Sequence, residues 1–483
     1  MKMKTKIAIT SILIFSLSFL NFQFNLFKVV STERFNTFQA ETDQFVLDGY
    51  LNHTINDKEL RLGNFSRPSI DMFKEGDKYK PREWFQNQFV GDGDFWEYKS
   101  QFGLQLKIFN LLKGDLLIAQ LINTIFLSLV FTIMFLLSLN FHSYKFSLIF
   151  ILTIIFNPWI TPIAKNLFFM VFSFFIPFLT TMYFANKTYY SNKKLFIMLF
   201  ILSLSFLFKS LNGYEYLTTI VLTSMIPILI FYLKNNFSFI KLFSHLFLIL
   251  IASVISFSSA IMIHANSLNE EEPFDRIYLN AMKRLSSIDP ERIAYDTCLK
   301  SFSEDAVTLD LSIKNNKDCY DELYESLTVS RVEVISKYLL ARNLVPFFGS
   351  FELVLDKIQE KNLKLIYYEE EISSLQKGKS FIKYYLNNIS KFNIFQMLSV
   401  FVNLILSPIL FLVLLIMFIL RMVNLDSKNL ILGLFILLPP LSWFVLAKGH
   451  SYITVYQLTF FIWYIPTISY IVASVFSKEK IIS

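Results

Sequence analysis

The chain has 483 residues, of which 54% are hydrophobic and only 17% are charged. Soluble domains contain about 25% charged residues, so this composition and the mean hydropathy of +0.47 exclude a soluble protein and indicate an integral membrane protein. The net charge of +7 does not indicate nucleic-acid binding, because the basic residues flank apolar runs, where membrane topology explains them.

Ten apolar runs in the sequence are long enough to cross a bilayer, which takes roughly 17 to 25 residues. We predict that each forms a transmembrane helix, so the expected fold is an all-α polytopic membrane protein. The predicted helices lie at residues 7–27, 115–140, 146–163, 167–185, 195–209, 217–233, 242–263, 395–420, 430–447 and 453–476. The first is predicted to be an uncleaved anchor, because no small-residue cleavage site precedes Phe22.

Lysines and arginines in the short connections predict the orientation of these helices, because such residues concentrate on the cytoplasmic side. If the N-terminus is cytoplasmic, only Lys165, Lys209 and Lys448 lie in the short outer turns. We therefore predict a multi-pass protein of the bacterial inner (plasma) membrane. Both termini are expected in the cytoplasm, with two large extracytoplasmic segments between them.

Five regions follow from this topology. They are an anchor helix at 1–27, a first extracytoplasmic loop at 28–114, a six-helix membrane region at 115–263, a second extracytoplasmic domain at 264–394, and a three-helix membrane region with a cytoplasmic tail at 395–483. The second extracytoplasmic domain is predicted to be mainly helical, because Val332, Ile335 and Leu339 belong to an apolar pattern with helical spacing.

Both cysteines of the chain, Cys298 and Cys319, fall in the second extracytoplasmic domain. In an oxidising compartment we expect them to form a disulfide, worth about 3 kcal/mol by the loop-entropy estimate. The alternative is a pair of free thiols. Neither a CxxC nor an HExxH spacing occurs in the sequence, so no zinc motif is predicted.

Acidic residues Glu41, Asp43 and Asp48 follow soon after the first predicted helix. A carboxylate at the membrane edge can act as a general base toward a hydroxyl group, and a pair of carboxylates can hold a divalent cation. The alternative is a solvated loop, and Asp48-Gly49-Tyr50 is also a typical turn sequence. We interpret Asp48 as a candidate catalytic residue and Glu41 and Asp43 as candidate substrate-binding residues. The metal, if any, is left open.

Each of the three short outer turns carries one lysine on the side where the topology rule disfavours it. Lys165, Lys209 and Lys448 are these residues, and a cation kept in such a place usually meets an anion. Other side chains of the same turns join the candidate site. Glu215 is a candidate catalytic residue, and Tyr214, His450 and Tyr452 are candidate substrate-binding residues.

A lipid-linked sugar phosphate or pyrophosphate is the anionic substrate that best fits these residues. Its polyprenyl tail would lie among the helices while its headgroup meets Lys165, Lys209, Lys448 and His450. The cations would stabilise the leaving phosphate, and Asp48 or Glu215 would remove a proton from the incoming hydroxyl. The expected partners are therefore membrane lipid and a polyprenyl-linked sugar donor, with no nucleic acid.

The plan of the chain resembles the GT-C superfamily of polyprenyl-phosphate-dependent membrane glycosyltransferases. The shared plan is a short anchor, an outer loop with acidic residues near its start, many helices and a second outer domain, and Glu41-Thr42-Asp43 matches the ExD form of the family's acidic motif. The resemblance implies extracytoplasmic sugar transfer to a glycan or lipid acceptor. The segments around Asp48, Tyr98 to Gln105, Glu215 and His450 also look like those of uncharacterised bacterial multispanning proteins.

The sequence leaves two alternatives open. An O-antigen or capsule polymerase would also use lipid-linked sugars outside the membrane, and a non-enzymatic scaffold in surface polysaccharide assembly would tolerate alanine at Lys209 or Glu215. A transporter is disfavoured, because no Asp, Glu, Lys or Arg lies near the centre of a predicted span.

Overall fold

The structure is a computed structural model, and it is mostly helical. It describes residues 3–27, 29–30, 32–37, 40–65, 81–90, 94–157, 160–268, 271–282, 291, 294, 320–321, 324–325, 328, 330, 394, 397, 413, 415–420, 427–447 and 458–477. Cys298, Cys319, Lys448, His450 and Tyr452 therefore lie outside the described residues, and the predictions made for them stay predictions.

Within the described residues, five helices are long enough and apolar enough to cross a bilayer. They are α1 (Met3–Phe24), α6 (Leu116–Ser138), α10 (Asn192–Asn212), α11 (Leu217–Lys234) and α12 (Phe239–Ser267). Two shorter apolar helices, α7 (Tyr144–Ile155) and part of α22 (Ser427–Leu446), accompany them. This arrangement confirms a mostly helical protein, with five candidate membrane-spanning helices among the described residues. The number of ten spans and their orientation stay predictions.

The starts of three of these helices are set by side chains that accept backbone hydrogen bonds. Asp115, Ser143 and Ser191 precede α6, α7 and α10, and each accepts from the N–H three residues later, at 2.9, 3.2 and 3.4 Å. Such a cap is worth about 1 kcal/mol, because it satisfies one of the backbone donors that a helix start leaves unpaired.

Two predicted helices are interrupted in the structure. The helix expected at 146–163 ends at Ile155 and resumes only as the short α8 (Ile160–Ile163), and the one expected at 167–185 begins as the 3-10 turn η2 (Val171–Phe174) before α9 (Ile176–Thr188). Proline explains the breaks, because it lacks an N–H and restricts the residue before it. Pro158 follows the end of α7, and Pro177 sits in the first turn of α9, where proline fits.

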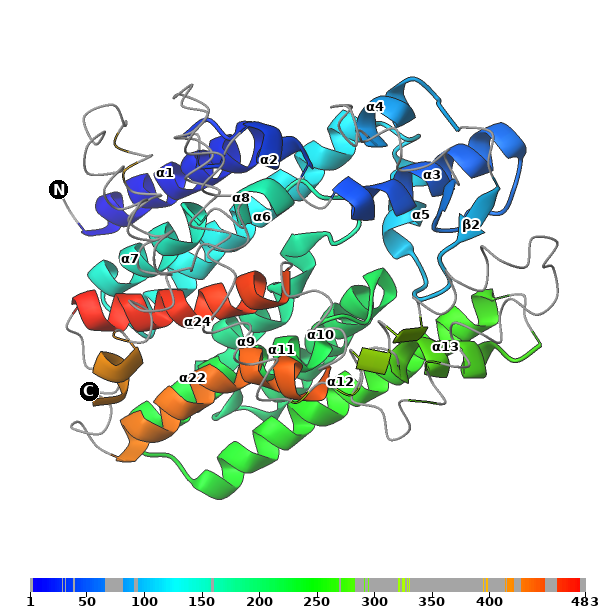
Figure 1. Cartoon of the computed structure of the whole chain (residues 1–483). Helices are drawn as coiled ribbons and strands as arrows, with labels where there is room; N and C mark the ends of the chain where they lie inside the picture. The colour runs from blue at the N-terminus through cyan, green and yellow to red at the C-terminus, as the bar shows by residue number, and fades with distance from the viewer. Residues whose placement is uncertain are drawn as a thin grey trace.

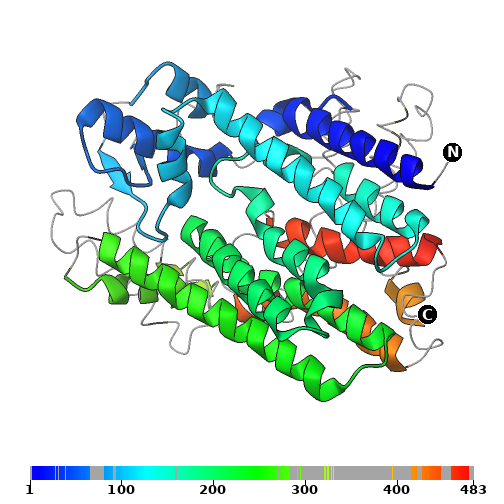
Figure 2. The same ribbon diagram turned by 180° about the vertical axis from the view of Figure 1, so that it is seen from behind.

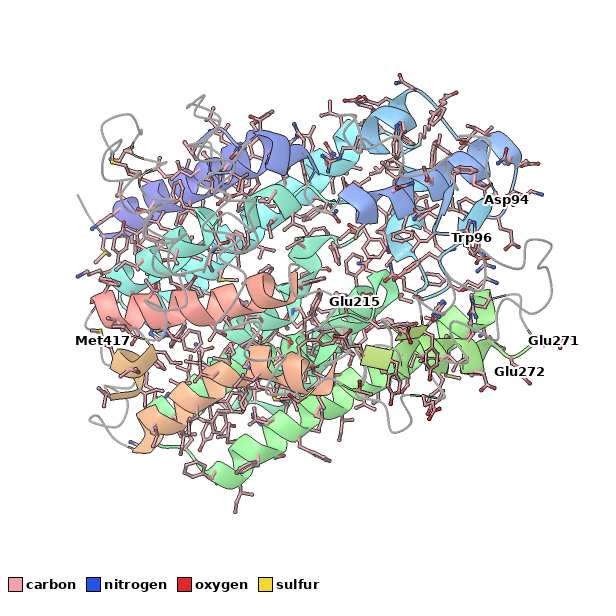
Figure 3. The ribbon with its side chains drawn as sticks, in the orientation of Figure 1. Asp94, Trp96, Glu215, Glu271, Glu272 and Met417 are labelled. Atoms are coloured by element: carbon pink, nitrogen blue, oxygen red, sulfur yellow. The ribbon has the colours of Figure 1, made fainter. Side chains whose placement is uncertain are left out.

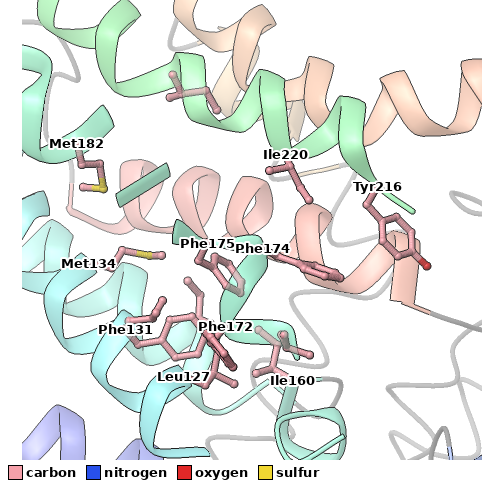
Figure 4. Packing of buried hydrophobic residues seen from close by; sticks show 14 of the residues in the cluster. Leu127, Phe131, Met134, Ile160, Phe172, Phe174, Phe175, Met182, Tyr216 and Ile220 are labelled. Carbon is pink, nitrogen blue, oxygen red and sulfur yellow. The ribbon is translucent and has the colours of Figure 1, made fainter. Parts of the chain in front are cut away.

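The long helices pack side by side, as both views of the ribbon show (Figures 1 and 2). α10 packs against α12, α1 against α6, α9 and α22 against α11, and α24 (Leu458–Ser477) against α7. Buried aromatic rings fill the space between them: Phe131 meets Phe175 edge to face at 5.3 Å, and Phe172 and Phe174 lie nearby (Figure 4). These rings use part of the phenylalanine excess as core packing.

The outward face of α12 is apolar and exposed, as lipid contact requires. Its exposed side chains include Phe243, Phe247, Val254, Ile255 and Met262. They recur at helical spacing along one face, whereas the opposite face of α12 is buried against α10. A soluble protein would not leave such a stripe in water.

Polar elements gather at one end of the helices, which we call the capped end. They are α2 (Thr32–Thr37), α3 (Ala40–Asn56), β1 (Gly63–Phe65), α4 (Pro81–Gln86), β2 (Phe95–Glu97) and α5 (Leu104–Leu111). The two strands pair antiparallel, with Asn64 opposite Trp96, and so add a small sheet to the predicted all-α fold. α13 (Pro273–Met282) lies at the same end (Figure 1).

Candidate functional site

Two buried charged side chains lie where α10 meets α11: Lys209 in the last turn of α10, and Glu215 in the turn that follows it (Figure 3 labels Glu215). Lys209 is 2% exposed and Glu215 is 6% exposed. The Nζ atom of Lys209 donates to the carbonyl oxygen of Gly213 at 2.6 Å and lies 4.5 Å from the centre of the Phe174 ring. These contacts and the C-terminal end of α10 stabilise a positive charge that burial alone would make costly.

Gln101 joins this turn from the polar segment that precedes α5. A β-carbon placed on Gly213 would collide with the side-chain oxygens of both Gln101 and Glu215. Glycine at position 213 leaves room for the ends of these two side chains, which would have to shift to admit a β-carbon, while its extended backbone needs no special conformation. The consequence is that an amide from the first polar segment lies beside the carboxylate of Glu215.

Three buried amide side chains in these segments have no hydrogen-bond partner among the described residues. Gln101, Gln105 and Asn212 are at most 4% exposed, and both polar atoms of each are unpaired there. Gln105 is in the first turn of α5, and α5 contacts α10, whose last residue is Asn212. An unsatisfied buried polar atom costs about 1–3 kcal/mol, so a hydrogen-bond partner for any of these amides would be stabilising.

Tyr214 connects the same turn to the end of α12. Its hydroxyl hydrogen-bonds Nδ1 of His264 at 2.9 Å. Burial, and then the negative charge of Glu215, raise the pKa of Tyr214 above its usual value. The phenol therefore stays protonated at neutral pH and serves as a neutral hydrogen-bonding group at the edge of the turn.

Tyr216 connects the turn to α22. It adopts a left-handed backbone conformation with φ of 63° and is the N-cap residue just before α11. Its ring lies 4.9 Å from that of Trp443, in the last part of α22. α22 ends at Leu446, and Ala447 is the last described residue after it. The predicted site residues Lys448 and His450 come next in the sequence.

Asp43 lies in a second polar cluster, between α3, α4 and the segment that follows α8. It is fully buried, and its Oδ2 atom accepts from Nη2 of Arg82 at 2.7 Å. Its Oδ1 atom accepts from the backbone N–H of Leu167, also at 2.7 Å. Asp43 therefore holds three segments together. This structural role is additional to the predicted role in substrate binding.

Lys165 belongs to this second cluster and not to the contacts of Lys209. Its Nζ atom lies 3.4 Å from Oδ1 of Asn36 and 3.7 Å from the centre of the Phe35 ring. Burial, and then the charge of Arg82, lower the pKa of Lys165 to about 7, against an opposing effect of Asp43. Two of the three lysines that the sequence grouped together thus make different sets of contacts.

Asp48 ties α3 to β1. Its Oδ2 atom accepts from Nε2 of Gln44 at 2.9 Å and from the backbone N–H of Phe65 at 3.1 Å. The turn suggested by Asp48-Gly49-Tyr50 does not form, because these residues lie inside α3. Glycine is needed at position 49 because a β-carbon there would collide with the carbonyl oxygen of Arg61. The catalytic role of Asp48 stays a prediction.

Glu41 and a possible metal site are the last two candidates from the sequence. Glu41 lies in α3, and its side chain is outside the described residues. In the part of the chain that the structure describes, no group of three or more His, Cys, Asp or Glu side chains could hold a metal ion. A divalent cation therefore stays an open expectation.

No protein-family model, no curated protein and no solved structure matches this chain. Function therefore has to be inferred from the site itself. The sequence pointed to the segments that hold Gln101, Gln105 and Asn212 but gave these residues no role, and it missed Arg82 altogether. The two glutamines are uncharged amides just before a predicted span, and Arg82 carries no motif, so only their contacts mark them.

Proposed function

We propose that this chain is a membrane enzyme that transfers a sugar from a polyprenyl-linked sugar phosphate to a cell-surface glycan or lipid. The observation that carries the proposal is the buried carboxylate of Glu215, with unpartnered amides in the segments that meet around it. Sugar hydroxyls both donate and accept hydrogen bonds, as carboxamides do, and a buried carboxylate can take a proton.

The headgroup would bind at the capped end with its phosphate toward Lys209. A buried ammonium group neutralises negative charge on a leaving phosphate more strongly than an exposed one, because the surroundings screen it less. The amides of Gln101, Gln105 and Asn212 would hold sugar hydroxyls. The polyprenyl tail would extend along the apolar helices, which already expose a lipid-compatible face.

In the transfer step the acceptor oxygen forms a bond to the anomeric carbon of the sugar. The bond from that carbon to the phosphate oxygen breaks, and polyprenyl phosphate leaves with the electron pair. The acceptor proton passes to the carboxylate of Glu215 as general base. Asp48 remains the second candidate for this role.

The proposal is tested in a deletion strain that is complemented with variants. Lipid-linked and surface glycans are analysed by mass spectrometry after complementation with wild type, Glu215→Gln or Glu59→Gln. Glu59 is a matched control, because it is an exposed carboxylate paired with Arg61. We expect wild type and Glu59→Gln to restore the glycan and Glu215→Gln to leave the unextended lipid-linked precursor.

The competing classes give other results. Glycans that are unchanged in the deletion strain would contradict the enzyme proposal. Restoration by Glu215→Gln to wild-type levels would favour a scaffold. Loss of long chains with single repeat units still made would favour a polymerase.

A further inference from the structure

Arg82 and Lys165 converge on a single residue of α2. The Nη1 atom of Arg82 donates to the backbone carbonyl of Asn36 at 3.3 Å, and the Nζ atom of Lys165 lies 3.4 Å from its side-chain oxygen. The two cations come from α4 and from the segment after α8, and α2 contacts α8. They therefore meet at one residue, Asn36, one on its backbone oxygen and the other on its side-chain oxygen.

The charges in this cluster do not balance among the described residues. Asp43 is the carboxylate that faces both cations, and its oxygens are already used by Arg82 and by the N–H of Leu167. Lys165 is left with an amide oxygen and an aromatic ring. Nε of Arg82 is buried and has no hydrogen-bond partner among the described residues. When Lys165 is protonated, two cations and one carboxylate leave an excess of one positive charge.

We propose that Arg82 and Lys165 bind one phosphate-type oxyanion at the junction of α2, α4 and the segment after α8. Arg82 is held in place by Asp43 and keeps Nε for the ligand, and Lys165 supplies a point charge. The oxyanion is the headgroup of an anionic membrane lipid or a free phosphate. This inference does not rest on sugar transfer, since none of these contacts involves the turn at 209–216.

The titration of Lys165 supports the inference. Arg82 from α4 and Asp43 from α3 are the charged groups that act on Lys165 among the described residues. With its pKa lowered to about 7, Lys165 is mostly neutral at pH 8, and a bound anion would restore its proton. Anion binding at pH 8 should therefore take up a proton from the buffer.

The experiment measures sulfate binding by calorimetry on the full-length protein in nanodiscs. Sulfate is the probe because it does not titrate near neutral pH, so proton uptake reports on the protein. We expect Lys165→Met to weaken binding about tenfold or more, as the loss of one charge-assisted bond does. Proton uptake, read from buffers of different ionisation enthalpy at pH 8, should vanish in that variant.

Two further variants complete the design. Arg82→Gln should also weaken sulfate binding, whereas Arg61→Gln should not, because Arg61 pairs with Glu59 and Glu97 away from the cluster. If Arg82→Gln fails to fold, the sulfate affinity of Lys165→Met and the proton uptake of the wild type still test the proposed oxyanion site. Lys165→Met should fold, because it leaves the ion pair of Arg82 and Asp43 in place.

The lipid composition of the nanodiscs identifies the source of the oxyanion. Weaker sulfate binding in phosphatidylglycerol than in phosphatidylcholine would mean that a lipid headgroup occupies the site. Equal binding in both would mean a free anion. Wild type that binds no sulfate in phosphatidylcholine at millimolar concentration would overturn the proposal, as would unchanged affinity in Lys165→Met.

Discussion

Gln101 and Glu215 place their side-chain oxygens against the same glycine, Gly213, although the two residues belong to distant parts of the sequence. This relationship joins the polar segment before α5 to the turn between α10 and α11. It makes the candidate site a product of tertiary packing, because neither segment alone contains both groups.

Gly213→Ala should destabilise the protein, because the added methyl group has to displace Gln101 or Glu215 in a packed region. Because the displaced atoms are the ends of flexible side chains, we expect a cost at the low end of overpacking, about 1 kcal/mol. The measurement is the midpoint of thermal unfolding in detergent, with tryptophan fluorescence as the signal. Adding Gln101→Ala to the variant should restore part of the stability. A midpoint equal to wild type in Gly213→Ala would show that the three residues do not pack as described.

Asp43→Asn should be strongly destabilising, because it leaves the largely buried guanidinium of Arg82 without its carboxylate. Breaking one side of a buried ion pair costs about 3–5 kcal/mol. Glu97→Gln is the comparison, since its pair with Arg61 is more exposed and longer, at 3.6 Å. Exposed pairs contribute about 0–1 kcal/mol. Equal losses in the two variants would refute the structural role of Asp43.

The stability of the protein should rise between pH 7 and pH 10 partly through Lys165. Its folded pKa is lowered to about 7 from 10.5, so between these values the unfolded chain binds more protons than the folded one. Stability increases with pH wherever the unfolded state holds more protons. Lys165→Met should flatten this rise in thermal midpoints measured across the range without added anions. If the thermal midpoint of Lys165→Met depends on pH as that of the wild type does, the lowered pKa of Lys165 is contradicted.

The orientation of the helices can be read by chemical labelling. A cysteine at Asn56, at the exposed end of α3, should react with a membrane-impermeant maleimide added to intact spheroplasts. A cysteine at Asn235, exposed between α11 and α12 at the opposite end, should not. The background is a chain with Cys298→Ser and Cys319→Ser, so that only the new thiols react. The reverse pattern would place the capped end in the cytoplasm.

Much of the helical fold is predictable from the sequence. The runs that became α6, α10, α11 and α12 are apolar over enough residues to cross a bilayer, and no tertiary information is needed to find them. Where α7 and α9 begin or end depends on proline and on local backbone geometry, such as the left-handed Met170 before η2. Those breaks shift predicted boundaries without changing the helical class.

The polar contacts were less predictable. The pairing of Asp43 with Arg82 and the approach of Gln101 to Glu215 join segments that no periodicity relates. Asp48-Gly49-Tyr50 looked like a turn because short-range propensity favours one, yet packing of α3 against Arg61 keeps it helical. The sequence identifies Lys165 and Lys209 as unusual cations. Only the fold shows that the two lysines contact different residues.

The most direct test of the proposed function is turnover by the purified protein. Wild type, Glu215→Gln and Glu59→Gln are reconstituted in nanodiscs with a panel of polyprenyl-linked sugar phosphates and candidate acceptors, and released polyprenyl phosphate is quantified. We predict release by wild type and Glu59→Gln from at least one donor, and a rate about 10²–10⁴ lower in Glu215→Gln, as loss of a general base gives. Equal rates in wild type and Glu215→Gln would contradict the assigned role of Glu215, and no release from any donor would contradict sugar transfer itself.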